Sequence, residues 1–166
     1  MVKLLGALAI FCTLSGCGLW RAHWYRRRAA CLALWQNALR EGERMLCTMG
    51  LQTAEWLDWM RTQPALAAFA RRCLAELGGE LHFARLWRES LYQAEFPLEK
   101  NELELLASIG DVIGRYDAAD QRAALETARS RLQSCELRAE VEVGSKGKMW
   151  SVLGLSAGAL AVVLLY

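Results

Sequence analysis

The chain begins and ends with an uncharged apolar run, and this pairing constrains its fold more than any other feature. Residues 4–20 form a run of seventeen residues, and residues 149–166 form one of eighteen. As a helix, each run would be roughly 26 Å long, which nearly matches a hydrocarbon core of about 30 Å. We therefore predict membrane-spanning helices in residues 1–20 and 149–166, with a domain of residues 21–148 between them.

The charges beside the two runs predict the side of the membrane on which this domain lies. Basic side chains gather at the inner ends of both runs: Arg21, Arg26, Arg27, Arg28, Lys146 and Lys148. Only Lys3 lies outside them. The positive-inside rule then places the central domain in the cytoplasm and both termini across a cell membrane that the chain crosses twice.

The N-terminal run admits a second interpretation. The segment Leu14-Ser15-Gly16-Cys17 follows an apolar stretch and has the small-residue pattern of a lipoprotein cleavage site. Cys17 would then be acylated, residues 1–16 would be removed, and the domain would be an extracytoplasmic helical binding module. The arginine cluster that begins four residues later is unfavourable to translocate and favours the uncleaved anchor.

The residues between the two runs predict an all-α domain. Ala, Leu, Glu and Arg dominate, and no sustained alternation of apolar and polar residues indicates a strand. Two long helices are expected, with apolar residues three, four or seven apart: Leu32, Trp35, Leu39 and Leu46 in the first, and Leu125, Ala128, Leu132, Cys135 and Ala139 in the last. We expect an antiparallel bundle in which these two helices lie side by side and lead into the two spans.

Turn residues divide the remaining sequence into short helices. Gly50 indicates a break after the first long helix, and Pro64 suits the first turn of a helix that ends at Gly78-Gly79. Further helices are expected over residues 80–95 and 98–113. In the first of these, Trp87 is expected to be a core anchor, because tryptophan buries a large apolar area. Of Trp56 and Trp59, only one can face fully inward.

Charge and composition exclude several function classes. Residues 41–142 carry 12 basic and 18 acidic side chains, a net charge of −6, which argues against a nucleic-acid partner. The only histidines are His23 and His82, and there is no phosphate-binding G-x-x-x-x-G-K-[ST] motif. The six cysteines form no C-x-x-C pair and are expected to be free thiols. We predict no enzymatic activity, cofactor, metal site or small-molecule substrate.

Carboxylates are plentiful, but their spacing does not indicate a catalytic pair. Glu99, Glu102, Glu104 and Asp111 are expected to form a solvated acidic face of one helix.

The segment of residues 109–117 has the most unusual composition. Gly110 is expected to allow a close approach between helices, Gly114 to be a left-handed C-cap, and Asp117 to cap the next helix. Arg115 and Tyr116 would then be exposed on the connecting turn, where they are candidate partner contacts. We expect Gly110→Leu to destabilise the bundle and Gly110→Ala to have a mild effect.

Two motifs and the layout of the whole chain resemble the stage III sporulation protein AB family. The first motif is the Trp-centred segment Ala84-Arg85-Leu86-Trp87-Arg88-Glu89-Ser90-Leu91. The second is Glu102-Leu103-Glu104-Leu105-Leu106, followed by Gly110, Ile113, Gly114, Arg115 and Asp117. Residues 48–55 depart from the family pattern, so a contact made by this turn is not implied.

The resemblance implies a function that the residues alone do not. Members of this family belong to a secretion-like channel complex that links mother cell and forespore, and they are similar to the F-type platform proteins of type II secretion. The resemblance therefore implies a non-enzymatic scaffold in the mother-cell membrane around the forespore. Its cytosolic domain would contact the ATPase of the complex, which is of the stage III sporulation protein AA type.

Overall fold

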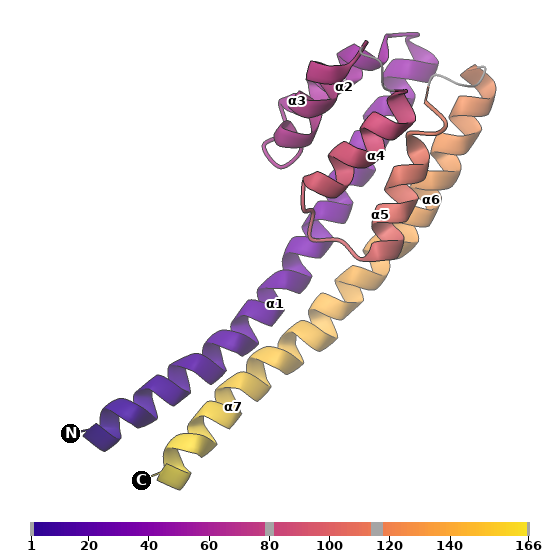
Figure 1. Ribbon diagram of the computed structural model, residues 1–166. Helices are drawn as coiled ribbons and strands as arrows, with labels where there is room; N and C mark the ends of the chain where they lie inside the picture. Colours follow the sequence, from indigo (N-terminus) through magenta and orange to yellow (C-terminus); the bar gives the residue numbers. More distant parts are fainter. Residues whose placement is uncertain (1, 79–81, 114–117, 166) are drawn as a thin grey trace. The chain divides into compact units, whose positions relative to one another are not determined.

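A computed structural model describes residues 2–78, 82–113 and 118–165, without the side chains of residues 2–11, 14, 118, 158 and 161–165. Every regular element in these residues is helical, so the predicted all-α fold is confirmed (Figure 1). In chain order the elements are α1 (Val2–Gly42), the π-helical η1 (Glu43–Thr48), α2 (Thr53–Arg61), α3 (Ala67–Glu76), α4 (Phe83–Gln93), α5 (Lys100–Ile109), α6 (Ala118–Glu142), the π-helical η2 (Val143–Gly147) and α7 (Lys148–Leu165).

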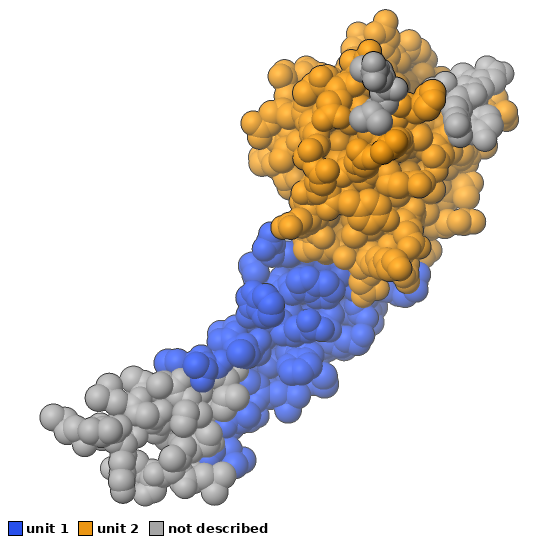
Figure 2. Space-filling view, viewed as in Figure 1, with its two compact units in different colours: residues 1–30, 137–166 blue, residues 31–136 orange. Residues whose placement is uncertain are grey.

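The chain forms two compact units, which are coloured separately in Figure 2. We call residues 1–30 with 137–166 the paired-helix unit, and residues 31–136 the bundle unit. Helices α1 and α6 each contribute residues to both units.

In the bundle unit, the end of α1 lies antiparallel to α6, as predicted. The Gln36 side-chain amide donates a hydrogen bond of 2.9 Å to the Arg129 carbonyl oxygen. Further along the chain, Glu43 accepts a 2.7 Å hydrogen bond from Arg129 and lies 3.6 Å from Arg122. The predicted apolar stripes face inward in both helices, although Leu46 and Cys135 are only partly buried.

Aromatic rings fill the core of the bundle unit. Trp35, Trp56 and Trp87 are fully buried, and Phe69 is almost so. The indoles of Trp56 and Trp87 are stacked with their centroids 5.5 Å apart, and Phe69 meets Trp87 edge-on at 4.9 Å. Trp59 is half-buried, in agreement with the prediction that only one of the α2 tryptophans faces fully inward.

Several predicted boundaries were wrong. Helix α3 begins at Ala67 rather than at Pro64, because residues 62–66 form turns in which the Leu66 N–H bonds to the Gln63 carbonyl. Gly78 has the expected left-handed φ of +92° after α3, whereas Gly79 lies outside the described residues. The two π-helical segments were not predicted at all.

The acidic face predicted for α5 was also wrong at Glu102. The helix begins two residues later than expected, at Lys100, which makes Glu99 the N-cap residue. The buried Glu102 carboxylate accepts a 2.8 Å hydrogen bond from the Glu99 N–H, and the Glu99 side chain bonds in return to the backbone at Glu102. Glu102 is therefore part of a reciprocal capping box and is not solvated.

The described residues of the two predicted spans are helical, since α1 includes residues 4–20 and α7 includes residues 149–165. Within the described part of the chain, no helix combines the length and the apolar character needed to cross a membrane. The division into residues 1–20, 21–148 and 149–166 thus stays a prediction.

Candidate functional site

Trp87 and Gly110, which the sequence singled out separately, lie in direct contact in the bundle unit. The Trp87 indole N–H donates a 2.8 Å hydrogen bond to the Leu106 carbonyl oxygen of α5. A Cβ atom placed on Gly110 would lie 2.7 Å from Cδ1 and 2.9 Å from Cβ of Trp87, closer than such atoms pack. The indole therefore occupies the space in which a side chain at residue 110 would lie. Trp87 is the core anchor that the sequence predicted.

A second glycine, which the sequence analysis missed, contacts a tryptophan in the same manner. A Cβ atom on Gly42 would lie 2.7 Å from Cε2 of Trp56, whose indole N–H donates a 2.9 Å hydrogen bond to the Ala38 carbonyl. Trp56 stacks on Trp87, so that each indole of the stacked pair lies against a glycine. The only feature of the sequence that could have indicated this contact is that Gly42 lies close to the end of a long apolar helical stripe.

The outer face of α4 forms a groove with the residue that follows Gly110. The groove measures about 460 Å³ and is lined by His82, Ala84, Arg85, Arg88, Glu89 and Asp111. Arg88 pairs with Asp111 at 3.1 Å, and Arg85 pairs with Glu89 at 2.8 Å. The groove thus joins residues of the Trp-centred motif to Asp111, the neighbour of Gly110 in the second motif, and we call it the α4 groove. Asp111, expected on an acidic face of its own helix, instead pairs with an arginine of α4.

The other candidate contacts cannot be placed at this groove. Gly114, Arg115, Tyr116 and Asp117 lie outside the described residues. Their predicted roles, as two caps and two exposed contacts, stay predictions.

Two cysteines of the bundle unit, Cys47 and Cys73, lack the features of a nucleophile. None of the six cysteines forms a disulfide in the described structure. Burial raises the pKa of Cys73 to about 11, and burial likewise raises the pKa of Cys47. A nucleophilic cysteine needs a lowered pKa, so neither thiol is activated. In the part of the chain that the structure describes, no group of His, Cys, Asp and Glu could hold a metal ion.

Comparison with known proteins decides the family. The family model described as stage III sporulation protein AB matches residues 3–166. The chain belongs to this family. The resemblance inferred from the two motifs is thereby confirmed, and the match includes both apolar runs and the α4 groove.

The fold of this family member is also found among solved structures. It is similar to a structure named stage III sporulation protein AB (SpoIIIAB), with a TM-score of 0.59 and 20% sequence identity. The similarity covers 70% of this chain and 95% of that one, and at this identity it shows a common fold. No curated protein matches the chain.

Proposed function

We propose that this stage III sporulation protein AB family member is a non-enzymatic membrane scaffold of a sporulation-specific, secretion-like channel complex. It lies in the mother-cell membrane around the forespore, and its bundle unit docks the cytosolic AA-type ATPase. The α4 groove carries this proposal, because it joins exposed residues of the Trp-centred motif to Asp111, which follows Gly110 of the second motif, in one surface.

The groove has the properties of a docking surface. Its four charged side chains in ion pairs are between 44% and 70% exposed, and exposed pairs contribute only about 0–1 kcal/mol each. A partner can therefore exchange these pairs for its own at little cost. On the opposite face of α4, the buried Trp87 packs into the core of the bundle unit.

Electrostatics indicates the charge of the partner. The bundle unit, residues 31–136, has 12 basic and 16 acidic side chains, a net charge of −4. A partner surface that meets the bundle unit should thus carry a basic patch, since complementary potentials steer association.

Exposed apolar side chains support the membrane anchors. In the paired-helix unit, Trp20, Val152 and Leu160 are exposed by 73%, 65% and 62%, and Leu19 and Leu155 by 54% each. Soluble surfaces rarely carry so many large apolar groups together, whereas lipid solvates them. Trp20 and Trp150 also suit the interfacial aromatic belt of a membrane.

The helix bounds support a coupling role. Helices α1 and α6 run unbroken from the bundle unit into the paired-helix unit. We infer that displacement of the bundle by the ATPase is transmitted along these two helices.

Asp111→Lys tests the docking proposal. The substitution removes the pair with Arg88 and places a cation where the basic partner would bind, so we expect ATPase binding to weaken at least tenfold. Binding is measured by pull-down of the purified AA-type ATPase with the full-length protein.

Asp58→Lys is the matched control, because Asp58 also forms an exposed pair with an arginine, Arg61 of α2, and lies outside the groove. Equal binding by both variants would refute the groove as the docking surface. Absence of binding by the wild-type protein at tens of micromolar would refute the ATPase as the partner.

The acylated lipoprotein is the alternative function. Cys17 is exposed, as acylation requires. Helix α1, however, runs through this residue without a break, which favours the uncleaved anchor. The intact mass of the protein purified from cells distinguishes the two, since processing removes sixteen residues and adds lipid.

A further inference from the structure

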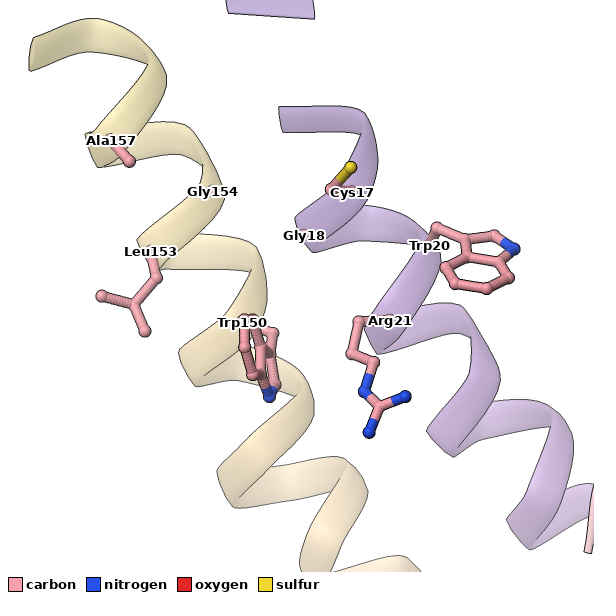
Figure 3. A pocket seen from close by; sticks show the side chains of 8 residues that line it. All are labelled: Cys17, Gly18, Trp20, Arg21, Trp150, Leu153, Gly154 and Ala157. Atoms are coloured by element: carbon pink, nitrogen blue, oxygen red, sulfur yellow. The ribbon is translucent and has the colours of Figure 1, made fainter. Parts of the chain in front are cut away.

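A pocket of about 390 Å³ lies between α1 and α7 in the paired-helix unit (Figure 3). Its lining includes Cys17 and Gly18 of α1, Trp150, Leu153 and Gly154 of α7, and one charged residue, Arg21. The remaining lining is apolar. This combination of an apolar cavity and a single cation is not used by the docking function proposed above.

The pocket exists because the two helices touch through their backbones. A Cβ atom on Gly18 would lie 2.6 Å from the Trp150 carbonyl oxygen and 3.1 Å from Cα of Gly154. Glycines allow this close approach, while the larger Trp150 and Leu153 project beside it. The space next to the contact is left unfilled.

Arg21 provides the charge of the pocket. Its guanidinium lies over the rings of Trp24 and Tyr25, with distances of 5.5 and 5.8 Å to their centroids. No carboxylate among the described side chains lies within ion-pair distance of it. The rings orient the guanidinium without neutralising its charge, which leaves it available to an anion.

We propose that this pocket binds one anionic phospholipid, with its phosphate at Arg21 and an acyl chain against Leu153 and Gly154. This inference rests on the proposed membrane anchoring, in which Arg21 and Trp150 lie at the inner membrane surface. An anionic phospholipid presents charge and hydrocarbon in the same order as the pocket, and basic pockets between membrane helices bind such head groups. A second copy of the chain would instead bring its own Arg21, Arg26 and Arg27 to the same depth, where like charges repel.

The test is native mass spectrometry of the full-length protein in detergent. Phosphatidylglycerol and phosphatidylcholine with identical acyl chains are supplied in equal amounts. We expect one retained phosphatidylglycerol per chain and at least a fivefold preference over phosphatidylcholine. Arg21→Gln should abolish the preference. Arg27→Gln removes an exposed arginine of the same cluster that does not line the pocket, and it should retain the preference.

A third variant tests the apolar part of the pocket. Ala157→Trp should fill the cavity and reduce retention of both lipids at least fivefold, with helicity followed by circular dichroism. If that variant does not fold, the comparison of the two arginine variants still decides. The proposal would be overturned if Arg21→Gln and Arg27→Gln lost the preference for phosphatidylglycerol equally. It would also be overturned if the wild-type protein retained both lipids equally, or formed a dimer without bound lipid.

Carbonate extraction of cell membranes separates this inference from the proposed function. Wild-type protein that resists extraction but retains no phosphatidylglycerol contradicts the lipid site alone. Protein that is released by carbonate contradicts both.

Discussion

Glycine at residues 42 and 110 is explained by the stacked indoles that lie against them. At Gly110 the backbone is ordinary, with φ of −60°, so conformational freedom is not the reason for glycine. The reason is that Cβ, Cγ and Cδ1 of the buried Trp87 lie within 2.9 Å of the position that a Cβ atom of residue 110 would occupy. These atoms belong to the near end of the side chain and cannot move away without shifting α4. The sequence-based expectation of a mild Gly110→Ala substitution is therefore revised.

Gly110→Ala should lower the free energy of unfolding by about 1–3 kcal/mol, and Gly110→Leu should lower it further. Gly144→Ala is the control, because a Cβ atom there meets nothing within 4 Å. Thermal unfolding followed by circular dichroism provides the measurement. If Gly110→Ala and Gly144→Ala have the same stability, the packing explanation is wrong.

Cys73 makes the stability of the bundle unit depend on alkaline pH. Its pKa is about 11 in the folded protein, against an ordinary value of 9.0, so the unfolded chain releases the thiol proton first. The contribution of Cys73 to the free energy of unfolding is thus complete below pH 9 and is lost between pH 9 and 11. Cys73→Ala should lose less stability over this interval than the wild type. Denaturant titrations between pH 9 and 11 measure the free energy of unfolding of both proteins. The same pH dependence in Cys73→Ala and the wild type would contradict this prediction.

At the scale of elements, the first turn of α5 depends on a side chain that sequence reasoning assigned to solvent. Periodicity predicts that Leu98, Leu105, Leu106, Ile109 and Ile113 face inward, and all of them are buried except Leu105, which is partly buried. Leu98 and Ile113, however, lie outside the bounds of α5. Periodicity could not locate the first residue of α5. Because the helix begins two residues later than predicted, Glu102 is its third residue, and its side chain closes a capping box with Glu99 instead of facing solvent. Similarly, pairing of Arg88 with Asp111 depends on how α4 and α5 pack, which a linear pattern does not contain.

Glu102→Ala should destabilise the protein by about 1 kcal/mol, because the Glu99 N–H loses its acceptor. Glu102→Gln keeps an oxygen at the same position and should recover most of the loss. Urea denaturation of the two variants measures the difference. Equal destabilisation by alanine and glutamine would indicate that charge, and not the hydrogen bond, is what matters.

At the scale of the whole molecule, the long-range features of the sequence predicted the most. The paired apolar stripes predicted that α1 and α6 are antiparallel, and the two motifs predicted the family. The α4 groove was not predicted, because it brings residues of α4 next to Asp111, which lies in the turn after α5. The lipid pocket likewise depends on the register between α1 and α7, which Gly18 and Gly154 set only once the helices are in contact.

The central claim is that two apolar helices anchor an enzymatically silent bundle in the cytosol, and the membrane side of the bundle tests it most directly. Cys73 is unsuitable as a probe, since it is buried. Ala68→Cys places a thiol on the exposed face of α3, in a background in which the exposed Cys12 and Cys17 are replaced by serine. We predict that a membrane-impermeant maleimide labels residue 68 only after protoplasts are lysed. Equal labelling in unbroken protoplasts would contradict the account.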